Sequence, residues 1–545
     1  MKSLDCSSPQ RRQFLKKTSI TAVAAAVTPA LAAARELSSA EQPQGQVKPF
    51  DLDEVTIADL QDGMTSGKYT SQAITEKYLT RIQEIDQQGP QLKSVIEVNR
   101  DALVIAEMLD KERKQNHIRG PLHGIPVLIK DNLDTADHMQ TTAGSLALVG
   151  SRPAEDSFVA KKLRDAGAVL LGKTNLSEWA NIRSSHSSSG WSGRGGQTKN
   201  PYALDRNPCG SSSGTGAAVS ANLCTAGIGT ETDGSVVCPS SSNGIVGIKP
   251  TVGLVSRSGI IPISHSQDTA GPMARTVRDV ATLLTAIAGP DPKDAPTAES
   301  QGKATDYTKF LDPNGLRGAR IGVARKYFGF SETVDDLMAH VLDEMKRAGA
   351  EIVDPADLPT HGKFDDTEFL VLLYELKADL NAYLANRPGA PKSLKDLIDF
   401  NDKNKDKEMP YFGQDIFLKA EAKGPLTTKE YTDALEANHR LSRKEGIDAI
   451  MDQHKLDAIV APTGSPAWVT DLVNGDHSAG GSSNAAAVAG YPDITVPAGF
   501  LFGLPVGISF FGRAWSEPIL LKIAYGFEQA TKVRKPPQFL PTANL

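Results

Sequence analysis

The sequence predicts an α/β protein, in which helices cover a large, parallel or mixed β-sheet. Its 545 residues are 40% hydrophobic, enough for a substantial core. Short apolar runs typical of buried strands, such as 127–129 and 168–171, alternate with helical patterns. Residues 360–450 are instead charged and helix-rich. We therefore expect one sheet with a helical insertion beside it.

The first elements follow from periodicity. Apolar residues recur at helical spacing and predict helices over 52–64, 71–85 and 99–115, the second capped by Ser71. The 127–129 strand comes next and ends at Lys130.

The remaining elements alternate in the same way. We expect segments 184–196 and 259–273 to be loops, the first exposed because it is rich in Ser and Gly. The other predicted elements are helices 157–166, 277–287 and 334–348, and strands 316–323, 458–460 and 493–496.

The N-terminus has the pattern of an export signal. Arg11 and Arg12 precede a small-residue apolar run over 20–34, which is typical of a twin-arginine signal and predicts a periplasmic or secreted protein. The alternative is a basic tail beside an alanine-rich helix. The run is too short for a stable membrane span, so no stable membrane insertion is expected. A polar linker, 35–49, follows.

Charge and cysteine content narrow the function classes. The net charge of −6, without a basic face, argues against a nucleic-acid partner. Cys6 lies in the signal, which leaves Cys209, Cys224 and Cys238 at spacings of 15 and 14 residues. An odd, clustered set predicts neither a disulfide framework nor a zinc site, and we expect small buried packing residues.

The serine-rich stretch over 205–250 is where chemistry is expected. Residues 210–214 satisfy G-x-S-x-G, which would make Ser212 the nucleophile of a strand–turn–helix elbow. That motif needs a strand running into the turn, and Pro201 and Pro208 precede it instead. We therefore reject Ser212 as the nucleophile.

A second candidate segment lies over 229–235, GTETDGS, and contains one serine, Ser235. Ser235 stands where a loop meets the apolar Val236 and Val237. The backbone N–H groups over 232–235 could converge on one oxygen, as an oxyanion hole requires. An ordinary tight turn is the alternative interpretation.

Lys130 is the candidate base. It ends an apolar strand, and burial lowers the pKa of a lysine so that neutral amine exists near pH 7. The alternative is a strand-end lysine that reaches into solvent.

Four segments occur in this order: GPLHGIPVLIKDNLDT, CGSSSGTGAAVSANL, GTETDGSVVCPSSSNGIVGIKPTVG and GPMARTVRD. Together with GYPDITVPAG near the C-terminus they resemble the amidase signature family, over about residues 50–535. The resemblance implies the amidase signature fold in a single domain, with the 360–450 insertion shaping the substrate pocket.

The resemblance also implies a Ser–cis-Ser–Lys triad and an acyl-enzyme. Ser235 matches the nucleophile, Ser211 the bridging serine that follows a cis peptide bond, and Lys130 the general base. The oxyanion-hole amides would be those of Thr232, Asp233, Gly234 and Ser235. No metal or organic cofactor is implied.

Departures from the common family pattern, such as Cys209 where glycine is usual, resemble the bacterial peptide amidase branch. The expected reaction is hydrolysis of C-terminal peptide amides with release of ammonia. The alternatives are an amidase for small aliphatic or aryl amides, one component of a tRNA-dependent transamidation enzyme, and a catalytically inactive binding protein.

Four further residues are assigned provisional roles. Glu375 and Gln414 are candidate pocket residues from the helical insertion. Asp205 is expected to orient Arg206 or the serine loop, and Asp268 to tie the loop of the 260s to the core.

Overall fold

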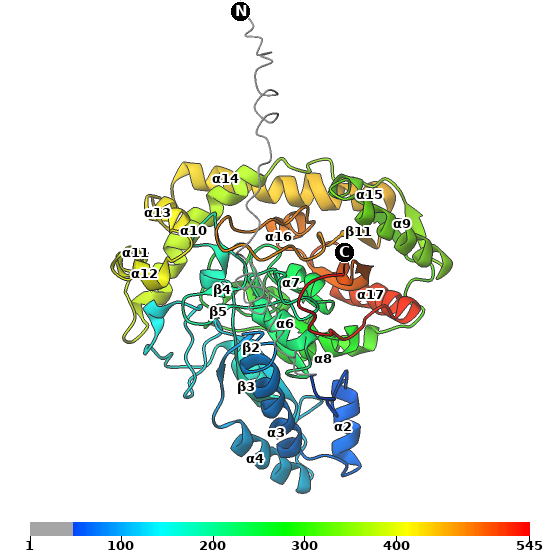
Figure 1. Cartoon of the computed structure of the whole chain (residues 1–545). Coiled ribbons are helices and arrows are strands. Elements are labelled where there is room, and N and C mark those ends of the chain that lie inside the picture. Colours follow the sequence, from blue (N-terminus) through cyan, green and yellow to red (C-terminus); the bar gives the residue numbers. More distant parts are fainter. Residues whose placement is uncertain (1–46, 545) are drawn as a thin grey trace, which may run out of the picture. The chain divides into compact units, whose positions relative to one another are not determined.

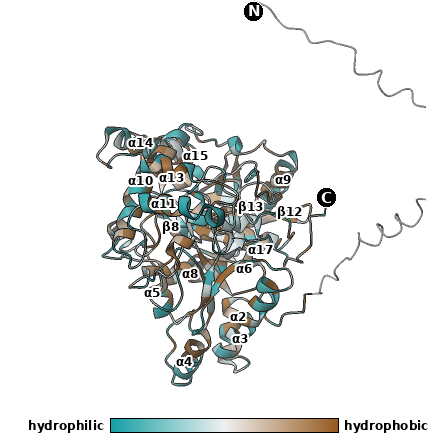
Figure 2. Cartoon of the chain, turned by 60° about the vertical axis from the view of Figure 1, so that its left-hand side comes forward, coloured by the Kyte–Doolittle hydropathy of each residue, from teal (hydrophilic) through white to brown (hydrophobic). Residues whose placement is uncertain are grey.

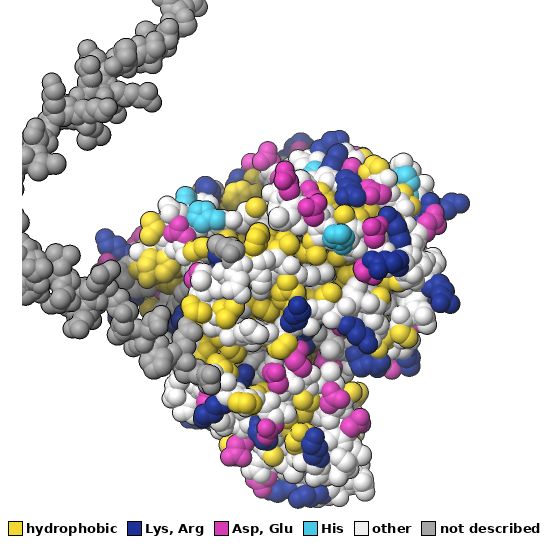
Figure 3. Space-filling model, turned by 45° about the vertical axis from the view of Figure 1, so that its right-hand side comes forward, with side chains coloured by type: hydrophobic (Ala, Val, Ile, Leu, Met, Phe, Trp, Pro, Cys, Tyr) yellow, Lys and Arg dark blue, Asp and Glu magenta, His cyan; other side chains and the backbone are white. Residues whose placement is uncertain are grey.

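The computed structural model describes residues 47–544, and the described residues from Lys48 onward form one compact unit (Figure 1). The predicted export signal and the first part of the predicted linker lie outside the described residues. Within the described part, no helix has both the length and the apolarity needed to cross a membrane. On the face in Figure 3, basic and acidic side chains are interspersed.

The core is one mixed sheet of eleven strands, which confirms the predicted fold class. Two short strands, β4 (Trp191–Ser192) and β5 (Gly196–Gln197), form a separate hairpin. In spatial order the sheet contains β1 (Val95–Val98), β3 (Val169–Thr174), β2 (Pro126–Lys130), β6 (Ala226–Glu231), β8 (Thr269–Ala274), β7 (Val246–Lys249), β12 (Asp493–Leu501), β13 (Leu504–Phe511), β11 (Ala458–Pro462), β9 (Arg320–Val323) and β10 (Glu351–Val353).

Three neighbouring strands of this sheet, β3, β2 and β6, run parallel. The register pairs Lys130 with Thr174 and Ile129 with Ile228. Residues 127–129 are fully buried, as expected for a parallel strand covered on both faces. The carboxyl ends of the three strands therefore meet at one edge, where α/β sheets commonly bind ligands.

Helices pack on the sheet at both sides of the serine-rich stretch. The short helix α6 (Ser213–Ser220) contacts β2, β3 and β6, and α7 (Val237–Ser242) contacts β7, β12 and β13. The other covering helices are α2 (Ile57–Thr65), α3 (Ser71–Arg81), α4 (Ala102–Lys114), α5 (Phe158–Asp165), α8 (Val277–Ile287), α9 (Glu332–Arg347), α16 (Asn484–Ala489) and α17 (Glu517–Thr531).

Local capping explains two differences from the predicted helix starts. The first helix begins at Ile57 rather than residue 52, because Thr56 and Asp59 form a capping box. In α3 the cap is Thr70, whose side chain accepts a hydrogen bond from the Ala73 N–H at 3.1 Å, and not Ser71.

The 360–450 segment is helical, as its composition indicates. It contains α10 (Asp365–Ala385), α11 (Leu394–Lys403), α12 (Lys405–Glu408), α13 (Asp415–Glu421), α14 (Lys429–His439) and the start of α15 (Asp448–His454). Figure 2 shows both hydrophobic and hydrophilic residues in the region of α10, α13 and α14. Leu376, Leu380 and Phe417 join Leu148 and Trp179 in one apolar cluster, which attaches these helices to the core.

Two predicted loops are more ordered than expected. Segment 184–196 is buried or half-buried except at Ser185 and His186, and Trp191 packs its ring against Phe412 with centroids 5.1 Å apart. The predicted 259–273 loop ends at Asp268, since β8 starts at Thr269.

The prediction for the cysteines was wrong in part. Cys209 and Cys238 form a disulfide, with Cα atoms 6.0 Å apart, whereas Cys224 is a free, buried thiol as expected. Sequence spacing did not reveal this pair. The two cysteines lie close together because β6 runs back through the sheet and places the start of α7 beside the serine loop.

Leu380→Ala tests the attachment of α10. Leu380 is fully buried, so the truncation should remove about 2–5 kcal/mol of stability and lower the thermal denaturation midpoint by several degrees. The matched control is Leu418→Ala on α13, where the side chain is 54% exposed. Equal midpoints for the two variants, measured by circular dichroism, would contradict this packing.

Candidate active site

Lys130 lies at the carboxyl end of β2 with no exposed surface. Its Nζ contacts the Oγ of Ser211 at 2.7 Å and of Ser212 at 3.1 Å. It also contacts the Oγ1 and the carbonyl oxygen of Thr230, at 2.9 and 3.3 Å. The amine is therefore surrounded by hydroxyl and carbonyl oxygens, and no carboxylate of the described residues contacts it directly.

Burial lowers the pKa of Lys130 to about 7, and the negative charges of Asp268 and Glu231 oppose this shift in part. A substantial fraction of the side chain is therefore neutral near pH 7. A neutral amine has a lone pair and can accept a proton from a neighbouring hydroxyl.

Ser211 follows a cis peptide bond with Gly210. Both Ser211 and Ser212 are fully buried. The carbonyl of Ser211 accepts a hydrogen bond from the Ser177 N–H at 3.1 Å, which fixes the loop against the segment after β3.

Ser212 has a supporting position. Its Oγ accepts from the Thr230 N–H at 3.2 Å and donates to the Thr230 carbonyl at 3.1 Å, so it joins the loop to β6. It precedes α6 directly, but no strand leads into it. The G-x-S-x-G elbow is therefore absent from this position.

Ser235 lies in the turn after β6, 9% exposed. Its carbonyl accepts a hydrogen bond from the Ser212 N–H at 3.2 Å, which places the two serine-bearing turns side by side. Among the described residues, none forms a hydrogen bond with the Ser235 hydroxyl. Catalytic hydrogen bonds are often long in an enzyme without substrate.

The turn from Thr232 to Ser235 is held from several sides. Gly234 has φ +74°, a conformation that lets successive N–H groups turn toward one side. The Oγ1 of Thr232 donates to Asp268 at 2.6 Å, and Asp233 accepts from the Ser483 hydroxyl at 2.5 Å.

Glu231 supports the other end of this turn. Its carboxylate accepts the N–H groups of Val236 at 2.7 Å and Val237 at 3.0 Å, directly after Ser235. Burial raises the pKa of Glu231, and the charge of Lys249 opposes that shift. Sequence reasoning missed Glu231 and Ser483. Glu231 ends a buried strand as Lys130 does, and that shared position was an available signal.

A cavity of about 540 Å³ opens beside these groups, with Ser211, Thr230 and Thr232 in its lining. One wall is the loop after residue 257, and the other is the C-terminal half of α10, including Ala382 and Tyr383. A second cavity, of about 410 Å³, shares six lining residues with the first and so extends it as one groove: Ser258, Gly259, Lys293, Ala382, Tyr383 and Asn386.

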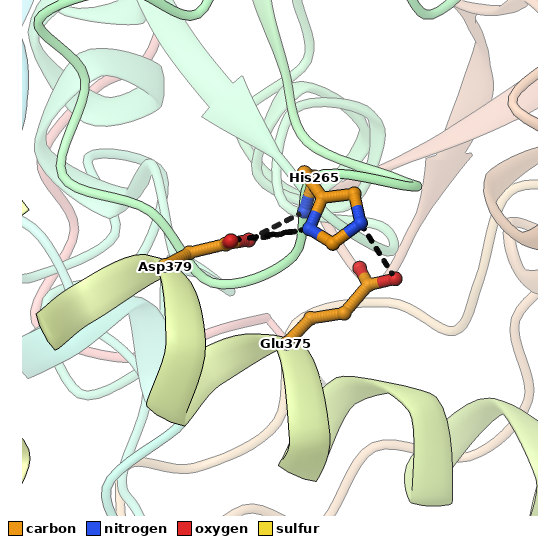
Figure 4. Close-up of side chains that lie close together, drawn as sticks. All are labelled: His265, Glu375 and Asp379. Atoms are coloured by element: carbon orange, nitrogen blue, oxygen red, sulfur yellow. Dashed lines mark hydrogen bonds and ion pairs between the residues drawn. The ribbon is translucent and has the colours of Figure 1, made fainter. Parts of the chain in front are cut away.

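The loop of the 260s is tied at both ends. Asp268 accepts the N–H groups of Ile263 at 2.8 Å and Ser264 at 2.9 Å, besides the Thr232 hydroxyl, as expected for its role. At the tip, His265 lies between two side chains of α10 (Figure 4). Its Nδ1 is 2.9 Å from Asp379 and its Nε2 is 3.3 Å from Glu375.

His265, Glu375 and Asp379 have the ligand types of a metal site. The Glu375 carboxylate, however, already accepts hydrogen bonds from Ser264 Oγ at 2.5 Å, Ser266 N at 3.0 Å and the Tyr431 hydroxyl at 2.7 Å. These donors satisfy the buried charge without a cation. The group fastens the loop to α10.

The provisional pocket residues lie behind the cavity wall or away from it. Glu375 does not line the cavity but supports the loop that does. Gln414 is buried within the helical segment, where it bonds Asn401 at 2.9 Å and Asp402 at 2.8 Å. Asp205 pairs with Arg206 at 3.4 Å.

Comparison with known proteins identifies the family to which the chain belongs. The Amidase family profile matches residues 73–521. A probable amidase of Arabidopsis thaliana is 44% identical over 502 residues, 90% of this chain and 93% of its own length. A putative amidase of Schizosaccharomyces pombe is 37% identical over 533 residues, 91% of this chain and 88% of its own length.

The solved structures include relatives of higher identity. Native peptide amidase from Stenotrophomonas maltophilia is 53% identical, with a TM-score of 0.86 over 90% of this chain and 100% of that one. Peptide amidase in complex with the competitive inhibitor chymostatin gives a TM-score of 0.88 at the same identity and coverage. This chain therefore belongs to the amidase signature family and is an amide hydrolase.

Proposed function

We propose that the enzyme removes the C-terminal amide of peptides and releases ammonia, by way of an acyl-enzyme on Ser235. Ser211 is the proton relay and Lys130 the general base. The observation that carries this proposal is the fully buried Lys130 amine, 2.7 Å from the Ser211 hydroxyl, next to the turn that bears Ser235.

In the first half of the reaction, neutral Lys130 takes the proton of Ser211, and Ser211 takes that of Ser235. The Ser235 oxygen attacks the amide carbonyl. The proton then returns through Ser211 to the leaving nitrogen, and ammonia departs. In the second half, the Ser211–Lys130 pair takes a proton from water, and the water oxygen attacks the ester carbonyl. The proton then returns to the Ser235 oxygen, which frees the peptide acid and restores Ser235.

The developing oxyanion needs donors that are already in position. The N–H groups of Thr232, Asp233, Gly234 and Ser235 are our candidates. Support comes from the rigidity of the turn, whose residues are bonded to Asp268, Ser483 and the serine loop. Because this turn is already fixed, little free energy is needed to reorient its N–H groups when negative charge develops on the substrate oxygen.

The groove supports a peptide as substrate. The two joined cavities start at Ser211 and continue past Tyr383, which offers room for several residues on the acyl side of the scissile bond. A small amide would leave most of this lining unused. The similarity to peptide amidase structures favours the same substrate class.

We also propose that the protein is exported through the twin-arginine segment at its N-terminus. The Arg11–Arg12 pair before a small-residue run supports this. The Cys209–Cys238 disulfide is consistent with it, because such bonds persist in oxidising compartments outside the cytoplasm.

Removal of the nucleophile or the base tests the triad. We expect Ser235→Ala to abolish ammonia release from an N-acetyl dipeptide amide, and Lys130→Ala to lower kcat by about 10³-fold or more because both groups act as one unit. Ser212→Ala, a neighbouring serine with a supporting role, should retain more activity than Ser211→Ala. Full activity of the Lys130 variant would contradict the relay.

The pH dependence tests the charge state of the base. Since Lys130 acts when neutral and its pKa is about 7, kcat/KM should fall about tenfold per pH unit below 7 and level off above it. Asp268→Asn removes a negative charge that raises this pKa, so the acid limb should move to lower pH. An N-acetyl dipeptide amide suits this measurement because it does not titrate. A flat profile between pH 5 and 8 would contradict the assignment.

A bulky residue in the groove tests the substrate class. Ala382→Phe should lower kcat/KM for amidated tripeptides by tenfold or more, given the clash with the bound chain, and spare acetamide. Ala385→Phe, on an exposed part of α10 outside the lining, is the matched control. A wild-type preference for acetamide or an anilide over amidated peptides would overturn the peptide assignment and favour a small-amide amidase.

A further inference from the structure

The Cys209–Cys238 disulfide encloses both reactive serines. Cys209 comes two residues before Ser211, and Cys238 comes three residues after Ser235. The covalent ring spans 29 residues of sequence separation and contains α6 and β6. The bond therefore joins the two turns on which the proposed relay depends.

Direct hydrogen bonds between the two turns are few among the described residues, although Ser212 Oγ bonds Thr230 near the end of β6 and Lys130 Nζ contacts both Ser211 and Thr230. The Ser212 N–H donates to the Ser235 carbonyl at 3.2 Å, which is at the long end for such a bond. Farther from the serines, the Asn243 amide donates to the Pro208 carbonyl at 2.8 Å. Neither bond holds the side-chain oxygens of Ser211 and Ser235 directly.

We propose that Cys209 and Cys238 are positioning residues for catalysis, and that their disulfide keeps the Ser211 and Ser235 hydroxyls at the separation that proton transfer needs. The proposal rests on the proposed function of these serines. When the bond is broken, the covalent link between the two turns is lost, and the serines are held only by non-covalent contacts. A misplacement of about 1 Å can cost about 100-fold in rate.

The bond is open to a small reductant from one side. Cys209 is 6% exposed, and Cys238 is half-buried. A dithiol supplies two electrons and two protons: the S–S bond breaks, both cysteines become thiols, and the dithiol closes to its own cyclic disulfide. The enzyme is then fully active only when oxidised, which matches the proposed destination outside the cytoplasm.

The third cysteine of the described chain provides a control. Cys224 is fully buried, and burial raises the pKa of its thiol to about 12, so it forms little reactive thiolate. It lies outside the two turns, and Cys224→Ala should leave turnover within about twofold of the wild type.

The test uses the full chain carrying Cys6→Ser and Cys224→Ala, so that thiol titration reads only Cys209 and Cys238. Before and after dithiothreitol, we would measure kcat and KM for an N-acetyl dipeptide amide, together with circular dichroism. Reduction should lower kcat at least tenfold, change KM less than twofold and leave the spectrum unchanged. Reoxidation should restore kcat. Unchanged kcat with two titrated thiols would overturn the proposal, as would a loss of activity that follows unfolding.

Cysteine variants provide a second, independent test of the proposal. Cys209→Ala, Cys238→Ala and the double variant break the same bond, so the three should lose kcat equally, and the effects should not add. Additive losses would mean separate packing roles and would overturn the proposal.

The rate at which a fluorophosphonate labels Ser235 measures the reactivity of the nucleophile without any amide substrate. It should slow on reduction even if the substrate assignment fails, and an unchanged labelling rate would overturn the proposal. Failure of the oxidised enzyme to hydrolyse any amide would instead reject the proposed function.

Discussion

Burial of one amine is the constraint on which the site depends. A lysine side chain without solvent contact is costly to keep charged, and here it gives up part of its charge rather than pairing with a carboxylate. Its neighbours Ser211, Ser212 and Thr230 belong to a loop and a strand that are far from β2 in sequence. The parallel register of β2 and β6 brings them together, so the chemistry of the amine follows directly from the order of strands in the sheet.

A buried layer of ionisable groups lies behind the Ser235 turn. Glu231, Lys249 and Asp493 are all fully enclosed, and burial raises the pKa of both acids and lowers that of the lysine. Buried ionisable groups are costly to leave without partners, and one carboxylate oxygen each of Glu231 and Asp493 has no hydrogen-bond partner in the described part of the chain. The other oxygen of Glu231 accepts the N–H groups of Val236 and Val237, so this buried acid also shapes the turn.

Much of this arrangement was predictable from the sequence. A continuous apolar run identified β2 as a buried strand, and the position of Lys130 at its end followed from that. The prolines before the serine loop excluded Ser212, and the structure indeed has no strand there. The bounds of α8 agree with the predicted helix 277–287, because its apolar periodicity is strong and Thr276 caps it.

The predictions that failed depend on contacts between residues far apart in the sequence. The disulfide depends on where β6 returns the chain, and the packing of Trp191 in segment 184–196 on an aromatic contact with the distant Phe412. Likewise, Ser483 supports Asp233 from a distance of 250 residues in the sequence, so no pattern near the serines could indicate it.

The origin of the two groove walls bears on how such an enzyme can diversify. The reacting groups stand at the end of β2 and in the two turns beside it, whereas one wall of the groove is α10, which packs chiefly on α14 and α13. Mutations that reshape this wall alter residues that carry no part of the proton relay. Selection can therefore change which amide is accepted while the hydrolytic step is inherited intact.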